Sequence, residues 1–389
     1  MASIALGSLW GHGLAVWPLA PVILLPVVWS WAGQRWLAGL VPALYVLAAT
    51  RGLIAGSEAF FARGSVFAVL LWLAAALPLW LVGMLCWHPR HLRRVVVGIP
   101  VLCLAWLLPP VMLVGWAHPL LAAGWWLPGM GIWALPLALV LLMLFAAFAR
   151  HPATPVLLVL IIGQALWRHP SPAINRHADI AAHHTAFAIG TAGSPLPDRQ
   201  TLLKRHWYMQ AMLDDAPNAR IHVFPESVAG FWDDYLAMQW QGFLARAHPG
   251  KTVLLGAYRR EGERPEGVVV AVNASTSRVV YVQRLPMTGG MVNPFGDRHE
   301  HFVSHWFGQS HGELVGRHGV MRAGFALCFE HVVLWPMLQT TLTRPDVVIA
   351  PASIWWAPLS LQNAQRQSLR LWALWLDVPV IESLNGAIP

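Results

Sequence analysis

Ala323-Gly-Phe-Ala-Leu-Cys-Phe-Glu330 is the stretch on which the fold and the site depend, because an apolar run typical of a strand ends there at Cys328. A helical pattern begins directly afterwards, at His331. A thiol between a buried strand and the start of a helix is a position where a lowered pKa and a nucleophile are expected. A single cysteine is more often a packed core residue, so this stretch alone leaves both interpretations open.

A second strand-type run, 220–224, is followed by Pro225 and Glu226. In α/β sheets, functional side chains gather at the carboxyl ends of the strands. Glu226 and Cys328 could therefore form a base and a nucleophile, in which the carboxylate takes the thiol proton and the thiolate attacks a carbonyl group. The alternative is that Glu226 caps the helical element that follows it.

Working outward from these two positions, the second half of the chain alternates between strand and helix patterns. We expect strands at 185–191, 220–224, 252–258, 268–274, 278–283, 323–327, 346–350 and 378–383, and helices at 202–213, 232–247, 331–342 and 359–376. The runs 268–274 and 278–283 predict a hairpin, so the sheet should be mixed. This alternation predicts an α/β domain over 181–389, after a Pro- and Asn-containing linker at 168–180.

The first half, 1–167, has a different composition. The whole chain is 57% hydrophobic and 11% charged, yet residues 1–167 hold only seven Arg and one Glu, with no Lys or Asp. Apolar runs cover about 14–33, 37–56, 66–87, 95–117, 120–149 and 153–167. Several reach the ~20 residues that a helix needs to cross a bilayer. Since the fifth run could form one helix or two, we predict an N-terminal transmembrane bundle of six or seven helices.

The orientation of this bundle follows from its loops. The basic loops contain Arg35, the segment 88–94, and Arg150, and with six spans all three fall on one side of the membrane. The positive-inside rule makes that side cytoplasmic. The C-terminal domain should then face the opposite compartment, which predicts a multi-pass inner-membrane protein with its α/β domain in the periplasm.

Several function classes are disfavoured by the sequence. The net charge of +8 arises mostly in the membrane half, without a basic stripe interleaved with aromatics, so no nucleic-acid partner is expected. The three cysteines are far apart and match no zinc spacing. Histidines 299, 301, 305, 311 and 318 fit no standard metal motif, and a lid segment is the preferred interpretation, so no metal is expected. Walker and GxGxxG patterns are missing, so no cofactor is expected either.

Three further motifs make the sequence resemble a known superfamily. Phe224-Pro-Glu226, Cys328-Phe-Glu330 and Ala350-Pro-Ala-Ser-Ile-Trp-Trp356, extended by residues 362–373 and 379–386, resemble the carbon–nitrogen hydrolase (nitrilase) superfamily. A membrane bundle before such a domain is similar to apolipoprotein N-acyltransferase and, more closely in size, to the TraB conjugal transfer protein family. The motifs cover about 180–389, whereas the membrane half agrees in architecture only.

The resemblance implies an αββα sandwich and a Glu–Lys–Cys triad. It assigns the general base to Glu226, the thioester-forming nucleophile to Cys328 and a supporting role to Glu330. The lysine has no clear counterpart, because the chain's only lysines, Lys204 and Lys251, precede the expected position. Arg284, beside Gln283, is the nearest cation; a second alignment puts Asp297 in the place of another acid. Arginine keeps the charge but is wider and planar.

The leading hypothesis is a membrane-anchored, periplasm-facing amidase or N-acyltransferase that supports conjugal plasmid transfer through a Cys thioester. Its catalytic residues would be Glu226, Arg284, Cys328 and Glu330, and its partners the lipid bilayer, a phospholipid, lipoprotein or peptide substrate, and the conjugation machinery. One alternative is a catalytically inactive nitrilase-like scaffold of that machinery, and another is true apolipoprotein N-acylation. Taken together, these features favour an enzyme in which the usual catalytic lysine is replaced.

Overall fold

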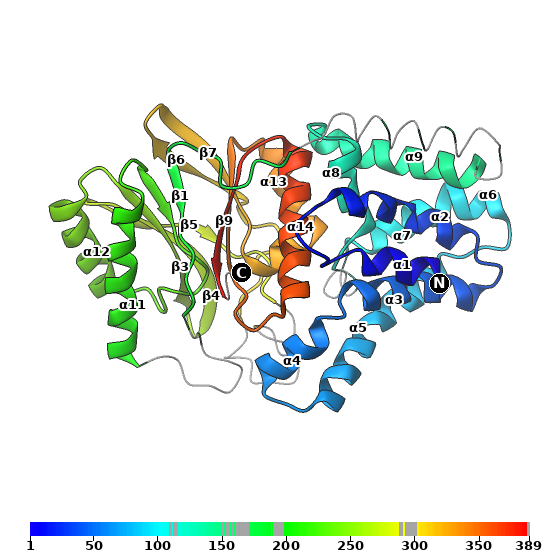
Figure 1. The fold of residues 1–389 in the computed structure, drawn as a ribbon, viewed down its shortest axis with the longest axis horizontal. Coiled ribbons are helices and arrows are strands. Elements are labelled where there is room, and N and C mark those ends of the chain that lie inside the picture. The colour runs from blue at the N-terminus through cyan, green and yellow to red at the C-terminus, as the bar shows by residue number, and fades with distance from the viewer. Residues whose placement is uncertain are drawn as a thin grey trace.

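The computed structural model contains a mixed α/β domain and a helical N-terminal half, which pack side by side along the long axis of the molecule (Figure 1). The structure describes residues 1–386 except 109–110, 112–115, 149–150, 152–155, 157–158, 160–162, 164–170, 188, 190–197, 288–290 and 292–301.

The first sheet of the α/β domain has five strands in the order in which they follow in the chain. They are β1 (Ile180–Ala182), β2 (Ile221–Val223), β3 (Thr252–Glu261), β4 (Arg264–Val272) and β5 (Ser277–Val282). The first three are parallel, and β3, β4 and β5 are antiparallel neighbours. The predicted mixed sheet and the β4–β5 hairpin are therefore confirmed.

The second sheet has four strands, again in chain order. They are β6 (His311–Gly316), β7 (Gly319–Phe325), β8 (Val347–Ser353) and β9 (Val380–Asn385). A hairpin joins β6 to β7, whereas β7, β8 and β9 run parallel. Strand β6 was missed by the sequence reasoning, which placed its first residue, His311, in a loop. The strand predicted at 185–191 is partly outside the described residues, and β1 lies before it, across the boundary between the predicted linker and the predicted domain.

The two sheets pack face to face between two layers of helices. Leu254 of β3 meets Phe325 of β7 in the core between the sheets. The neighbouring Val253 points to the opposite face, where Trp240 packs, because side chains alternate across a strand. Four helices form the outer layers: α11 (Arg199–Ala211) and α12 (Asp234–Ala247) on the first sheet, α13 (Leu334–Thr343) and α14 (Leu359–Leu376) on the second. The predicted αββα arrangement is present.

Local sequence signals explain where these helices start and stop. Asp198 and Asp233 cap α11 and α12, their carboxylates accepting the backbone N–H of Thr201 and Leu236, each at 2.8 Å. Such caps satisfy one of the free donors of the first helical turn. Helix α14 follows Pro358 and ends at Asp377, which has the left-handed φ of 55° common after a helix.

The N-terminal half is built of helices of uneven length. In chain order they are α1 (Ala2–Ser8), η1 (Trp17–Leu24), α2 (Leu25–Ser30), α3 (Arg35–Ala49), α4 (Leu53–Phe61), α5 (Ser65–Leu85), α6 (His91–Arg93), η2 (Arg94–Gly98), α7 (Ile99–Ala105), η4 (Pro119–Ala122), α8 (Ala123–Trp126), η5 (Gly131–Trp133) and α9 (Ala134–Phe148). Helices α3 and α5 approach closely at Gly39, where a Cβ would lie 2.5 Å from the Trp80 carbonyl oxygen.

The prediction of six or seven membrane-crossing helices is wrong for the residues that the structure describes. Two helices there are long and apolar enough to cross a bilayer, Ser65–Leu85 and Gly131–Phe148. A third candidate is the pair Arg35–Ala49 and Leu53–Phe61, which is bent by 61°. The predicted span 153–167 lies mostly outside the described residues.

The other apolar runs are broken by proline and glycine. The run 14–33 forms η1, a 3-10 helix with Pro21 inside it, followed by the short α2. Proline removes a backbone donor and clashes with the preceding turn, so a continuous α-helix does not form. In the run 120–149, α8 stops before Pro128 and Gly129, and α9 starts anew at Ala134. Hydropathy alone predicted one span over the run 14–33, where the structure has two short helices, and it did not locate the break that limits the candidate span of the run 120–149 to Gly131–Phe148.

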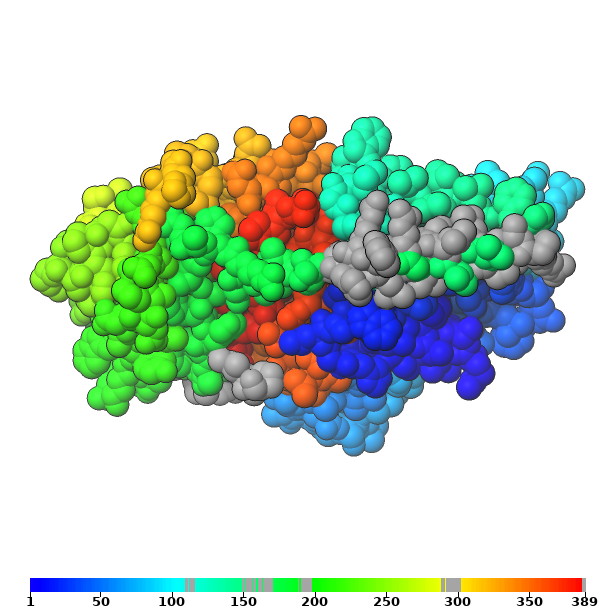
Figure 2. All heavy atoms as spheres, turned by 45° about the horizontal axis from the view of Figure 1, so that its top comes forward, coloured from blue at the N-terminus to red at the C-terminus, as the bar shows by residue number. Residues whose placement is uncertain are grey.

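Helix α14 lies between the second sheet and the N-terminal half (Figures 1 and 2). Its apolar residues Trp372 and Trp375 belong to the same core as Trp10 and Trp29 of the N-terminal half. Gly124 allows α8 to touch α14, since a Cβ there would lie 2.3 Å from the Leu371 carbonyl oxygen. The two halves thus share one hydrophobic core.

Candidate active site

Cys328 lies directly after β7, at the first position of a 3-10 helix, η8 (Cys328–His331). Its backbone φ is 43°, in the left-handed region that a residue with a Cβ seldom occupies. Such strained positions occur at functional sites, where the surrounding structure holds them in place. The side chain is 8% exposed, and its sulfur lies 3.8 Å from the Ser353 carbonyl oxygen.

Glu226 reaches the Cys328 thiol from the end of β2. The two groups meet at the Ser353 backbone, since Glu226 Oε2 accepts its N–H and the Cys328 sulfur lies near its carbonyl oxygen, and they are close enough for each to alter the other's pKa. The same carboxyl group accepts the backbone N–H of Ser353 at 3.2 Å and the Gln283 side-chain amide at 3.4 Å. The structure therefore brings together the two residues that the sequence proposed as base and nucleophile, although they are about a hundred residues apart in the chain.

Burial sets the protonation of this pair. It raises the pKa of Glu226 to about 7 and raises the pKa of Cys328 well above its usual value, with the Glu226 charge adding to the effect on the thiol. A carboxyl group with a pKa near neutrality is well suited to act as a general base. The arrangement therefore favours a thiol that is neutral at rest and gives its proton to Glu226 as it attacks.

Glu330 is a fully buried carboxylate that holds the loop around Cys328. It accepts four hydrogen bonds: from the backbone N–H of Leu327, Arg284 and Leu285 at 2.7, 2.7 and 3.0 Å, and from the Tyr281 hydroxyl at 2.7 Å. Four donors satisfy the acceptor capacity of an ionised carboxylate. Glu330 thus connects the end of β5 to the turn that carries Cys328.

Arg284 is also fully buried, but its guanidinium group points toward α13. Its nitrogen atoms donate to Tyr281 Oη at 2.9 Å, Phe325 O at 3.0 Å and Gln339 Oε1 at 2.8 Å, with longer contacts to Pro336 O and Thr340 Oγ1. Among the described residues, neither Glu226 nor Cys328 is one of these partners. The structure therefore does not place the Arg284 charge beside the thiol.

Two side chains at the site were not predicted from the sequence. Gln283, next to Arg284, is the residue whose amide reaches Glu226. Gln365 of α14 donates to the Cys328 carbonyl oxygen at 3.1 Å and lies 2.9 Å from His331 Nδ1. Gln283 could have been found by its position at the end of a strand, whereas Gln365 looked like an ordinary solvent-facing residue of an amphipathic helix.

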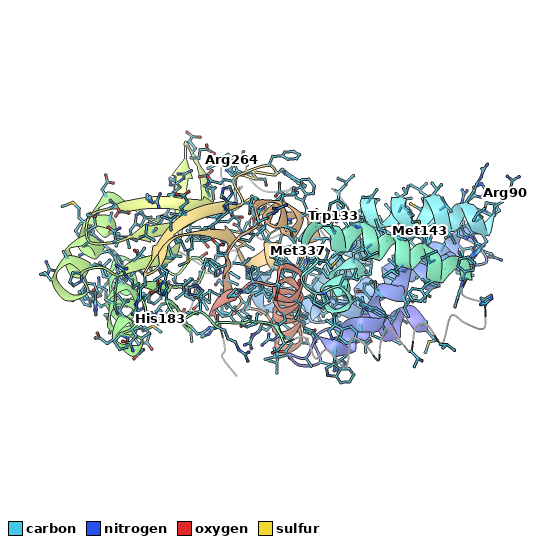
Figure 3. The ribbon with its side chains drawn as sticks, turned by 90° about the horizontal axis from the view of Figure 1, so that it is seen from above. Arg90, Trp133, Met143, His183, Arg264 and Met337 are labelled. Atoms are coloured by element: carbon cyan, nitrogen blue, oxygen red, sulfur yellow. The ribbon has the colours of Figure 1, made fainter. Side chains whose placement is uncertain are left out.

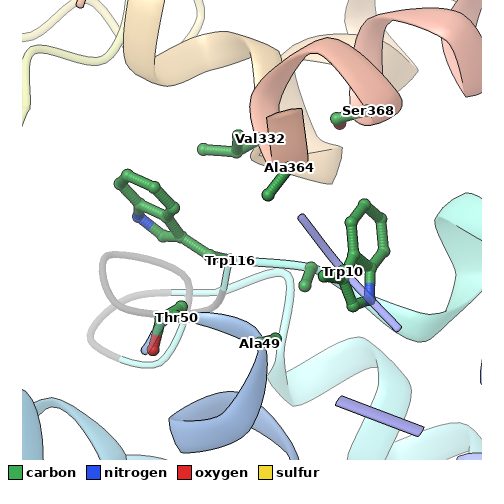
Figure 4. A pocket seen from close by; sticks show the side chains of 8 residues that line it. Trp10, Ala49, Thr50, Trp116, Val332, Ala364 and Ser368 are labelled. Atoms are coloured by element: carbon green, nitrogen blue, oxygen red, sulfur yellow. The ribbon is translucent and has the colours of Figure 1, made fainter. Parts of the chain in front are cut away.

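The site lies where the α/β domain meets the N-terminal half. Cys328 packs with Ile354 and Leu361, and this cluster is covered by Leu53, Trp116 and Trp356. Leu53 and Trp116 belong to the N-terminal half. Next to it is a small cavity whose lining comes from both halves (Figure 4): Trp10, Ala49, Thr50, Trp116, Ala117, Val332, Ala364 and Ser368.

The predicted histidine-rich segment is described only in part, because His299 and His301, like Asp297, lie outside the described residues. His305 Nε2 is 2.6 Å from Glu266 Oε1, and Glu261 completes a group that could in principle hold a cation. The Glu266 carboxylate is also bound by the Arg259 Nε at 2.7 Å. Because Arg259 already forms an ion pair with this carboxylate and His305 hydrogen-bonds to it, an ion pair explains the group better than a metal.

Comparison with known proteins gives relatives over the full length of the chain, although no family model matches. A probable conjugal transfer protein TraB from Sinorhizobium fredii (strain NBRC 101917 / NGR234) is 31% identical, covering 99% of this chain and 97% of the relative. The conjugal transfer protein TraB of Agrobacterium fabrum (strain C58 / ATCC 33970) is 30% identical, covering 99% of this chain and 91% of the relative.

Similar solved structures are more distant. An amidase from Nesterenkonia sp. AN1 has 16% sequence identity and a TM-score of 0.32, covering 46% of this chain and 67% of the amidase. A glutamine-dependent NAD+ synthetase from Acinetobacter baumannii has 16% identity and a TM-score of 0.31, covering 45% of this chain and 32% of the synthetase.

Proposed function

The chain belongs to the TraB family of conjugal transfer proteins, and from this premise we propose that it is a membrane-anchored acyl-transferring or amide-cleaving enzyme that supports conjugation. The observation that carries the proposal is that the buried Glu226 carboxyl group and the Cys328 thiol meet at the Ser353 backbone, with Cys328 in a left-handed backbone conformation. A base held next to a strained nucleophile is the arrangement that covalent catalysis requires.

In the proposed reaction, Glu226 takes the Cys328 proton while the sulfur attacks the carbonyl carbon of an acyl donor. A C–S bond forms, the bond to the leaving nitrogen or oxygen breaks, and that atom takes the proton from Glu226. The product is a thioester on Cys328. Water or an amine then attacks the thioester, giving a proton to Glu226, and the sulfur leaves and recovers a proton from the same carboxyl group.

The membrane setting is part of the proposal. Helix α5 exposes Leu70, Leu73, Leu77 and Leu81 along its length, as a lipid-facing helix would. Arg90, in a basic loop, lies at the end of the molecule farthest from the sheets (Figure 3). The positive-inside rule then supports a cytoplasmic end at Arg90 and a periplasmic α/β domain, with the conjugation machinery as its partner.

Two other functions are each favoured by one observation. Among the described residues, no cation contacts the Glu226–Cys328 pair. This favours an inactive scaffold of the conjugation machinery, because the developing oxyanion would lack a charged partner there. The position of the thiol under Leu53 and Trp116 favours lipoprotein N-acylation with a phospholipid donor, because an acyl chain could arrive along the N-terminal half.

The decisive experiment is to incubate the full chain, purified in detergent, with phospholipid vesicles or with short acyl esters and amides. Intact-protein mass spectrometry and peptide mapping then test for an acyl group on Cys328, with Cys328→Ala as the control. We expect acylation in the wild type and a loss of at least ~10²-fold in Glu226→Gln. Full plasmid transfer by cells that carry Cys328→Ala would refute a catalytic role and support the scaffold.

A further inference from the structure

Gln283 lies where a charged side chain would contact the Glu226 carboxyl group and shift its pKa, yet its own side chain is a neutral amide. It follows the last residue of β5 and is 1% exposed. Its backbone N–H donates to the Gly267 carbonyl oxygen at 2.8 Å, which fixes the residue against β4. Its side-chain nitrogen donates to Glu226 Oε1 at 3.4 Å. The amide is therefore held in one direction, toward the base.

Gly267 provides the space for this side chain. A Cβ at Gly267 would lie 2.5 Å from Gln283 Oε1 and 3.3 Å from Gln283 Cβ. Any larger residue on β4 would push the amide away from Glu226. Gln283 Oε1 has no hydrogen-bond partner among the described residues, although it is buried. A buried amide with an unsatisfied oxygen costs stability, and packing alone does not account for this cost, which points to a role other than packing.

The groups around Glu226 come from several strands or from the loops that follow them. Cys328 and Glu330 follow β7, Tyr258 comes from β3, and the Ser353 N–H comes from β8. Among the described residues, all the titratable groups facing the carboxyl group are acids. Gln283 is thus the only side chain in this set that favours the ionised carboxylate without itself releasing a proton.

We propose that Gln283 is a positioning residue that holds the Glu226 carboxylate against Cys328 while adding no charge, so that the nucleophile forms only when Glu226 is ionised. This inference rests on the proposed function, because it concerns the same base and thiol. A cation at this place would stabilise the carboxylate and extend reactivity to lower pH. The neutral amide instead limits reactivity to neutral and alkaline pH.

The test is the pH dependence of Cys328 alkylation by iodoacetamide in the full-length protein, followed by peptide mass spectrometry between about pH 5 and pH 10. The S–C bond forms as iodide leaves, and Glu226 takes the thiol proton. For the wild type we expect a rate that rises with a midpoint near the pKa of Glu226, about 7. Peptide mapping separates Cys328 from Cys86 and Cys103.

Two variants probe the amide. In Gln283→Lys, the ammonium group should lower the midpoint by about one pH unit or more, because an opposite charge within about 4–6 Å favours the ionised acid. In Gln283→Met, which keeps the volume and removes the donor, the midpoint should rise. If the lysine variant does not fold, the methionine variant alone decides. Midpoints equal to that of the wild type in the folded variants would overturn the proposal.

Glu226→Gln separates this inference from the proposed function. If it removes the midpoint near neutral pH, Glu226 is the base, and the Gln283 variants then test the inference independently. If it leaves the profile unchanged, the base–nucleophile pair itself is wrong.

Discussion

Replacing Glu226 by glutamine should stabilise the protein at alkaline pH, and replacing Glu330 by glutamine should destabilise it, although both carboxyl groups are buried. Burial raises the pKa of Glu226 from its ordinary value of 4.5 to about 7. The folded state therefore binds a proton more tightly than the unfolded chain does. Stability contributed by the protonated form is present below about pH 4.5 and is lost as pH rises through about 7.

The size of the effect follows from this difference. Because each pKa unit corresponds to ~1.4 kcal/mol, ionised Glu226 costs the folded state about 3 kcal/mol, as an upper estimate. Glu226→Gln removes this charge but keeps an oxygen that can accept the Ser353 N–H. The variant should gain up to about 3 kcal/mol over the wild type at about pH 8.5, and almost nothing at about pH 4.5.

Glu330→Gln is the matched comparison, since Glu330 is also buried but accepts hydrogen bonds from four donors. Four donors point at the Glu330 carboxylate, and an amide nitrogen would face at least one of them. The unmatched buried donors should cost on the order of 3 kcal/mol. Denaturant unfolding of the detergent-solubilised full chain, followed by tryptophan fluorescence at both pH values, measures both variants. A Glu226→Gln variant that is less stable than the wild type at alkaline pH would refute the assignment of a desolvated base.

Three further predictions test the surroundings of the site. Arg284→Lys should lose several of the buried guanidinium hydrogen bonds and lower the free energy of unfolding by about 2–4 kcal/mol in denaturant titrations. It should not move the pH midpoint of Cys328 alkylation. The control Arg278→Lys, at an exposed residue, should change neither quantity. Gly124→Ala should lower the thermal midpoint because its Cβ would meet the Leu371 carbonyl oxygen at 2.3 Å, whereas Gly64→Ala, with open space around it, should not. Burial lowers the pKa of His183 to about 4 and that of His222 to about 3, so the unfolded chain takes up protons at a higher pH than the folded protein does. The free energy of unfolding should therefore fall as pH drops from about 6.5 toward 4. In His222→Gln this decrease should be smaller.

The sequence predicted the layers of the α/β domain because its strands carry strong local signals. Strand β8 is a run of apolar residues, and α14 keeps its amphipathic pattern from Leu359 to Leu376. Strand β6 was missed because it has only two large apolar residues, Leu314 and Val315, between glycines and near histidines, which resembles a loop. The membrane half was overcounted since mean hydropathy is the same for a straight helix and for one broken by Pro21 or Gly129.

The positions of Glu226 and Cys328 could be singled out because their signals are local: each follows an apolar strand. The contacts of Arg284 were not predictable in the same way, because Gln283 and Arg284 lie beyond the end of β5, where the chain leaves the strand. The Gln283 side chain contacts Glu226, whereas the Arg284 guanidinium group contacts Gln339 of α13. Charge alone suggested Arg284, whereas the backbone path after the strand puts its neutral neighbour beside Glu226.

Helix α14 connects the N-terminal half to the loop that carries Cys328. Its Asn363 and Gln367 hydrogen-bond to Gly11 in the N-terminal half, while Gln365 holds the Cys328 carbonyl oxygen. One helix thus hydrogen-bonds to both the N-terminal segment and Cys328 through neighbouring polar side chains. These amides look solvent-facing in the sequence, yet each is buried. Because the same helix binds Gly11 and the Cys328 carbonyl oxygen, a shift of α14 against the N-terminal half would also change the contact at Cys328.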